Sequence, residues 1–188
     1  MLTRAFVVSG APATGKSVLG AALARAAGAA PLDQDVLTGP LTAVVAHLVG
    51  ARAGDLDDPR VRAHTRDATY AALLDTAAGC LAAGVSVVLV APFTAERSDP
   101  AAWARLGDRL GTPVVLVWTT CPPDEVARRL TARGAPRDQR KLADLAGFLG
   151  SGALDPPVVP HVAVDTTAPL AEQVTAALTG TATPAPGR

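Results

Sequence analysis

The sequence predicts an α/β fold in which helices cover both faces of a parallel β-sheet. Short apolar runs alternate along the chain with longer segments rich in Ala, Leu and Arg, and this alternation is typical of repeated strand–helix–strand units. The apolar runs are dense in β-branched residues, as in residues 85–91 (VSVVLVA), which favours strands buried on both faces. The length of 188 residues suits one domain.

The first half of the chain supplies three predicted strands and three helices. The strands are expected over residues 5–9, 30–33 and 85–91. The helices are expected over residues 15–27, 38–49 and about 60–83. The second of these helices places four apolar side chains on one face, Leu41, Val44, Val45 and Leu48. Gly84 fits the C-terminal cap of the third helix.

The second half supplies two further strands and four helices. The strands are expected over residues 114–119 and 161–164. The helices are expected over residues 100–110, 123–133, 138–149 and 169–178, and the prolines before Asp124 suit the start of the second. Residues 180–188 (GTATPAPGR) are predicted to form a disordered tail, which leaves residues 1–179 as a single domain.

Composition and charge exclude several classes of protein. The 17 basic and 17 acidic residues cancel, so the basic excess of proteins that bind long nucleic acids is missing. Cys80 and Cys121 lie in no CxxC pattern, which argues against a disulfide framework or a zinc site. No apolar run approaches the roughly 18 residues that span a bilayer, and the first apolar run is too short for a signal peptide. We expect a cytoplasmic protein without a membrane partner.

A glycine-rich motif follows the first predicted strand. Residues 10–17 (GAPATGKS) match GxxxxGK[ST], and Lys16, one of only two lysines, falls on the required position. The glycines let the backbone N–H groups turn inward, and the following helix directs its positive end at phosphates. Lys16 would reach the β- and γ-phosphates and Ser17 would bind Mg²⁺. ATP and Mg²⁺ are therefore the expected cofactors, with these nucleotide-binding positions: Gly10, Ala13, Thr14, Gly15, Lys16, Ser17 and Val18.

Two acidic residues follow the second predicted strand, at the sheet edge where ligands of such folds bind. Asp33 and Asp35 are candidates to orient an acceptor hydroxyl and take its proton. We predict Asp35 as the base, which also holds the metal together with Ser17, and Asp33 as a supporting group that contacts substrate. Either residue could be the base. The alternative is a solvated acidic turn or a helix N-cap.

Three more side chains are candidates for the acceptor side. Phe93 and Arg97 follow the third strand, which ends at Ala91 without a carboxylate. Phe93 could wall the acceptor pocket, and Arg97 could bind an anion. Arg66 shares a helix face with Arg62 and could line the pocket of an anionic acceptor. Core packing for Phe93 and a solvated surface for the arginines are the alternatives.

A basic segment near residues 128–141 is predicted to be a lid. It holds six basic residues in fourteen positions. The forked guanidinium of arginine suits phosphate oxygens, and a flap that bears arginines also excludes water. Arg133 and Arg137 are the expected phosphate contacts, because charge neutralisation there would accelerate phosphoryl transfer. A basic solvated helix is the alternative.

These motifs together resemble the small P-loop kinase group that includes chloramphenicol phosphotransferase, gluconate kinase and zeta toxins. The resemblance rests on the phosphate loop, the acid after the second strand, residues 121–134 (CPPDEVARRLTARG) and residues 164–167 (VDTT). It implies a five-stranded parallel P-loop fold with a lid, and ATP-dependent phosphorylation of a hydroxyl group. It also implies that Arg129 is a lid arginine that binds the nucleotide and that Thr167 lies in a loop near the adenine.

The sequence thus predicts a monomeric or homodimeric kinase whose partner is a small molecule with a hydroxyl group, a metabolite or an antibiotic. A kinase of nucleotides or of RNA 5′ ends is one alternative. A P-loop protein that hydrolyses ATP slowly to switch a partner is another. The NKxD guanine motif of Ras-like GTPases is excluded, because the chain contains no Asn.

Overall fold

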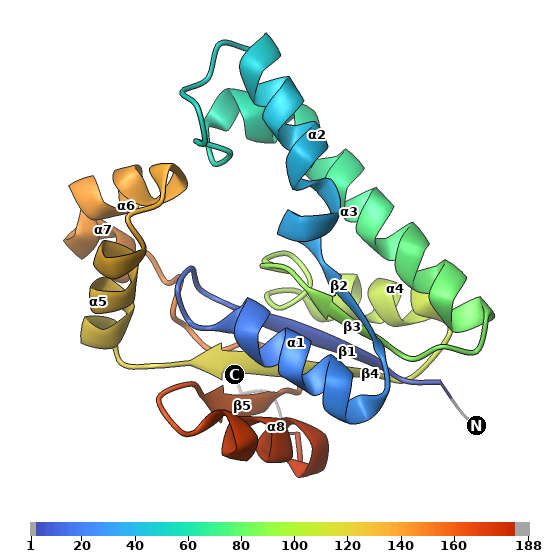
Figure 1. Cartoon of the computed structure of the whole chain (residues 1–188). Coiled ribbons are helices and arrows are strands. Elements are labelled where there is room, and N and C mark those ends of the chain that lie inside the picture. The colour runs from blue at the N-terminus through green and yellow to red at the C-terminus, as the bar shows by residue number, and fades with distance from the viewer. Residues whose placement is uncertain (1–2, 183–188) are drawn as a thin grey trace.

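A computed structural model describes residues 3–182 and shows one parallel sheet of five strands in the order β2-β3-β1-β4-β5 (Figure 1). The strands are β1 (Ala5–Gly10), β2 (Ala30–Asp33), β3 (Val87–Val90), β4 (Val114–Thr120) and β5 (Val162–Asp165). The central strand β1 pairs with β3 and β4, so the chain first moves outward from β1 to the edge strand β2 and then reverses across the sheet to β3, β4 and β5. The carboxyl ends of all five strands therefore meet at one edge, where ligands bind in open α/β sheets.

Helices cover both faces of the sheet. They are α1 (Lys16–Ala27), α2 (Gln34–Leu48), α3 (Pro59–Ala82), α4 (Pro100–Leu110), α5 (Pro123–Arg133), α6 (Gln139–Ala143), α7 (Leu145–Leu149) and α8 (Leu170–Thr179), with a 3-10 turn η1 at Pro136–Asp138. Within residues 3–182 no helix is both long and apolar enough to cross a bilayer.

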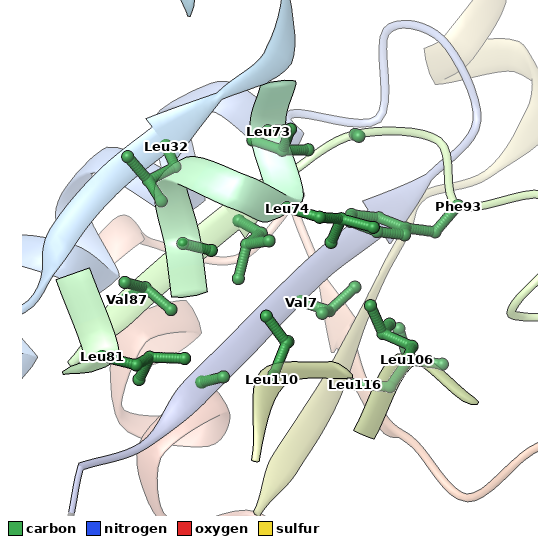
Figure 2. Packing of buried hydrophobic residues seen from close by; sticks show 14 of the residues in the cluster. Val7, Leu32, Leu73, Leu74, Leu81, Val87, Phe93, Leu106, Leu110 and Leu116 are labelled. Carbon is green, nitrogen blue, oxygen red and sulfur yellow. The ribbon is translucent and has the colours of Figure 1, made fainter. Parts of the chain in front are cut away.

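The core consists of two apolar layers separated by the sheet. Alternate residues of a strand point to opposite faces, so Val7 belongs to the layer under α3 and α4, while Phe6 and Val8 belong to the layer under α1 and α8. Figure 2 shows the first layer, in which Leu73 and Leu74 of α3 lie beside Phe93. Burial on both faces explains why the strands are continuous apolar runs.

Helix α2 begins earlier than predicted, and its apolar face is largely exposed. It begins at Gln34, four residues earlier than expected, because the Asp33 carboxylate accepts a hydrogen bond from the Asp35 N–H and caps the helix. The predicted apolar face does not pack on the protein. Leu41 and Leu48 are 74% and 76% exposed, whereas Thr38 and Thr42 are buried. The helix packs chiefly on α3 and β2, and Figure 1 shows the α2–α3 pair rising from the sheet.

The helix predicted over residues 138–149 is broken into two short helices. Asp144 separates α6 from α7, and its carboxylate accepts a hydrogen bond from the Gly147 N–H at 2.9 Å. An Asp side chain that caps a new helix competes with continuation of the old one, which explains the break. Of the predicted tail, residues 183–188 lie outside the described residues.

Candidate active site

A cavity of about 550 Å³ opens at the carboxyl edge of the sheet. Its walls come from the phosphate loop, the start of α2, the first half of α3, the loop after β3 and the lid, which here means residues 128–141. These segments lie far apart in the sequence, and the parallel sheet brings them to one place because each follows or faces a strand end. The cavity therefore collects most of the residues that the sequence singled out.

The phosphate loop is held in its curled form by buried contacts. Ala13 and Gly15 have left-handed φ angles of 66° and 88°, which turn successive N–H groups inward. Gly10 has no room for a side chain, since a Cβ atom there would overlap the Thr119 hydroxyl. The Thr14 hydroxyl donates to the Ala11 carbonyl at 2.8 Å. Thr14 thus stabilises the loop from behind and does not line the cavity.

Lys16 lies at the first turn of α1 and lines the cavity together with Ser17 and Val18. Its Nζ donates to the Ala11 carbonyl at 2.7 Å. The pKa of Lys16 is lowered to about 8, chiefly by burial; Asp35 opposes this shift, and Arg133 and Arg137 contribute to it. Three cations therefore surround the end of the loop, and an anion placed among them would satisfy all three.

Asp33 and Asp35 have different partners. The Ser17 hydroxyl donates to Asp33 Oδ2 at 2.6 Å, so Asp33 lies against the phosphate loop. Asp35 points the other way and pairs with Arg137 of the lid, with Oδ2 and the guanidinium nitrogen 2.6 Å apart. Ser17 and Asp33 are hard oxygen donors placed side by side, which fits Mg²⁺. Within residues 3–182 no three His, Cys, Asp or Glu side chains form a metal site alone, so such an ion would also need phosphate oxygens.

All six basic residues of the lid have acidic partners. Arg128 and Arg129 both pair with Glu125, and Arg133 forms a two-pronged pair with Asp138, which is fully buried. Arg137 pairs with Asp35 as above. The remaining two reach the loop before α3, where Arg140 contacts Asp55 and Asp58 and Lys141 contacts Asp57. The lid therefore lies over the cavity with its charges already neutralised.

The part of the cavity formed by α3 and the loop after β3 contains arginines that lack acidic partners within residues 3–182. Arg62, Arg66 and Arg97 line it, and none has a carboxylate partner within 4.0 Å among the described residues. The Arg66 guanidinium donates to the Thr94 hydroxyl at 3.1 Å. The Arg97 guanidinium donates to the Asp155 carbonyl at 2.9 Å and stacks on Trp118. Guanidinium groups that face a cavity without a carboxylate partner of their own favour a negatively charged ligand.

A family profile covers the residues that build this site. The profile of AAA_33, described as an AAA domain, matches residues 6–151. The chain belongs to the AAA_33 family. Among curated proteins, none matches this AAA_33 chain with significance.

Solved structures of kinases share the fold of this AAA_33 domain. A candidate kinase from Chloroflexus aurantiacus j-10-fl has a TM-score of 0.67 and 21% identity, with 92% of both chains covered. A gluconokinase from Sinorhizobium meliloti 1021 has a TM-score of 0.56 and 23% identity, with 95% of this chain and 91% of that chain covered. An APS kinase from Mycobacterium tuberculosis, solved with AMPPNP and APS, has a TM-score of 0.55 and 18% identity, with 94% and 96% covered. The predicted five-stranded P-loop fold is confirmed.

Besides Thr14, two further predicted site residues of the AAA_33 chain do not line this cavity. Phe93 is fully buried in the core, edge-on to Tyr70 with ring centroids 5.6 Å apart, and does not line the cavity. Thr167 is also absent from the lining, and its hydroxyl donates to Asp165. Its neighbour Thr166 instead accepts a hydrogen bond from Arg129 at 3.0 Å.

Sequence reasoning missed the acidic partners of the lid. Asp55, Asp57 and Asp58 fall between two predicted helices, and Asp138 falls at the start of another. The signal was present, because an acidic loop and a basic lid in one small domain have complementary charge. The sequence offered no sign of which acid faces which base.

Proposed function

We propose that this AAA_33 protein transfers the γ-phosphoryl group of ATP to a hydroxyl group of a small molecule. The observation that supports this function best is the position of Asp35, which shares one cavity with the phosphate loop and is bound by an arginine of the lid. A switch protein needs the loop alone. A carboxylate on the acceptor side of the loop suits removal of a proton from an attacking hydroxyl.

Each charged group has a role in this reaction. Lys16 and the N–H groups of residues 13–17 bind the β- and γ-phosphates. Ser17 and Asp33 would hold Mg²⁺, which neutralises phosphate charge when bound. The acceptor oxygen forms a bond to the γ-phosphorus as the bond to the β,γ-bridging oxygen breaks. The hydroxyl proton passes to Asp35, and ADP leaves.

Arg137 connects nucleotide binding to the base. In this structure the Arg137 guanidinium forms a 2.6 Å ion pair with the Asp35 carboxylate. When the γ-phosphate arrives, this guanidinium exchanges the carboxylate for phosphate oxygens, which suit its fork equally well. That exchange releases Asp35 toward the acceptor and places positive charge where the transferred group develops its negative charge.

The acceptor in this proposal carries a negative charge. Arg62 and Arg66 are exposed to the cavity without acidic partners, whereas every basic residue of the lid has one. A carboxylate, sulfate or phosphate group on the acceptor would supply the anionic partner that Arg62 and Arg66 lack. The names of two similar structures, the gluconokinase and the APS kinase, denote acidic acceptors and agree with it.

The test measures ATP consumption with Mg²⁺ against alcohols offered as matched neutral and acidic pairs, followed by mass spectrometry of the products. We expect acidic members to gain one phosphoryl group. Asp35→Asn should lower kcat by about 10²- to 10⁴-fold, the usual contribution of a general base, with little change in the KM for ATP. Asp67→Asn is the matched control, since Asp67 is exposed on α3 outside the cavity lining. ATP hydrolysis that ignores every acceptor and survives Asp35→Asn would contradict the proposal and favour a switch.

A further inference from the structure

Helix α2 carries an exposed apolar stripe. Its five residues are Val36, Leu37, Leu41, Val44 and Leu48, which are 77%, 40%, 74%, 55% and 76% exposed. They are half of the ten large apolar side chains that are exposed within residues 3–182. Single exposed apolar residues are ordinary on a protein surface, but a contiguous patch marks an interaction site.

The stripe has the spacing of a helix-packing seam. Leu37, Leu41, Val44 and Leu48 follow one another at intervals of four, three and four residues, which places them along one side of a helix. None of the stripe residues lines the cavity. The other side of α2 packs on the protein and contributes Thr38 and Thr42 to the cavity wall. In Figure 1 the end of α2 farthest from β2 projects beyond the sheet, and the exposed fractions above show that nothing in the described chain covers the stripe.

Charge restricts the kind of partner. From Val36 to Val49 the chain has no Asp, Glu, Lys or Arg, so a charged surface placed on the stripe would lose its hydration without gaining an ion pair. The covering surface must itself be apolar and uncharged. A stripe without charge meets a copy of itself without repulsion, which is the condition for a symmetric contact.

The rest of the described surface offers no second apolar patch of this kind. The other five exposed apolar residues are spread over α1, α8 and the segments before β3 and β5, namely Val18, Val85, Val158, Leu170 and Leu178. A head-to-tail contact between copies would need such a second patch. The surface that matches the stripe is therefore the same stripe on another copy.

We propose that a second copy of this chain covers the stripe, so that two α2 helices pack together around a two-fold axis. The exposed parts of the five side chains amount to about 500 Å² of apolar surface. Exposed neighbours on the same helix, Pro40, Ala43 and His47, extend the contact toward the roughly 800 Å² per partner of a standard interface. The dimer would also brace the helix whose inner side forms the wall of the cavity.

Molar mass in solution tests this proposal. Light scattering after size exclusion should give twice 18.9 kDa for the wild-type chain at tens of micromolar, and one chain mass for Leu41→Glu. Leu41 is exposed, so its replacement should leave the fold intact, which a thermal melt checks. Leu178→Glu on α8, exposed to 37%, is the matched control and should stay dimeric. A monomeric wild-type chain, or a Leu41→Glu variant that remains a dimer, overturns the proposal.

A cross-link tests the position of the axis. Val44 lies near the middle of the stripe, so Val44→Cys should be joined to its own copy by a short bis-maleimide, whichever way the two helices run. The wild-type chain, which keeps Cys80 and Cys121, shows the background from those thiols under the same conditions. A dimer whose Val44→Cys variant gives no cross-link above that background would place the interface elsewhere and refute the proposed seam.

Discussion

Asp33 and Asp35 show how two neighbouring carboxylates acquire different tasks. Both lie at the start of α2, so both experience the same positive helix end. Their hydrogen bonds separate them. Asp33 is fixed by the Ser17 hydroxyl and by the Asp35 N–H, while the Asp35 side chain is 62% exposed and held by a lid residue. A fixed carboxylate suits a metal, and one that a moving lid can release suits a base, which supports Asp35 for the proton.

Lys16 leads to a prediction about pH. Its pKa is lowered to about 8, chiefly by burial, and bound phosphates would raise that pKa again because they favour the charged ammonium. Below pH 8 the free protein already carries the proton, so binding of Mg-ATP should be independent of pH there. Above pH 8 binding must first take up a proton, and affinity should fall by up to tenfold per pH unit.

Calorimetry in two buffers of different ionisation heat measures that proton uptake directly. We expect uptake that approaches one proton per Mg-ATP at pH 9 and vanishes at pH 7. Lys16→Met should bind more weakly and show no such uptake at either pH. Equal proton uptake by the wild-type and Lys16→Met proteins at pH 9 would mean that another group titrates.

At the scale of elements, the lid and the loop before α3 are joined by a set of ion pairs that we call the clasp. It consists of Asp55, Asp57 and Asp58 with Arg140 and Lys141. Lys141 Nζ lies 2.5 Å from Asp57, and Arg140 lies 3.2 Å from Asp58. Hydrogen bonds from Arg60 hold the pKa of Asp58 at about 2, so this acid stays charged at any ordinary pH. The clasp connects the lid to the helix pair that forms the acceptor wall.

We expect the clasp to limit wasteful hydrolysis of ATP, because an open lid admits water to the γ-phosphate. Lys141→Met should raise acceptor-independent ATP hydrolysis relative to phosphoryl transfer by a few-fold, the size of effect that partly exposed ion pairs support. The ratio of ADP to phosphorylated product measures this. The paired exchange Asp57→Lys with Lys141→Asp should restore much of the wild-type ratio.

The controls for the clasp separate charge from packing. High salt should move the wild-type ratio toward that of Lys141→Met, since partly exposed pairs are screened. Arg109→Met removes an ion pair with Asp75 on α4 and α3, away from the cavity, and should leave the ratio unchanged. A Lys141→Met protein with the wild-type ratio at low salt would show that these pairs do not hold the lid.

Across the whole molecule, the features that the sequence predicted are those that local patterns determine, namely the strands and the phosphate loop. All five strands lie within two residues of their predicted ends, because β-branched runs bounded by turns leave few alternatives. The phosphate loop followed from its motif. The features that the sequence did not predict depend on tertiary contacts. Periodicity identified the apolar face of α2 but could not show that this face points outward, and nothing local distinguishes a Phe93 in the pocket wall from one in the core.

The position of α1 against the sheet depends on one glycine, Gly20. A Cβ atom on Gly20 would overlap Cγ2 of Val90 in β3, so this helix, which carries Lys16 and Ser17, lies unusually close to the strand. Gly107 in α4 has nothing within 4 Å of the same position. Both are helix-interior glycines, for which alanine would gain about 1 kcal/mol of helix propensity.

Gly107→Ala should therefore stabilise the protein by up to about 1 kcal/mol. Gly20→Ala should instead destabilise it by about 1–3 kcal/mol, the cost of forcing an extra methyl group into a packed core. Urea unfolding of the two variants measures both free energies. Because the clash pushes α1 away from β3, Gly20→Ala should also weaken Mg-ATP binding, whereas Gly107→Ala should not. If both alanines stabilise equally, then α1 has room to move, and the phosphate loop is not fixed by its contact with the sheet.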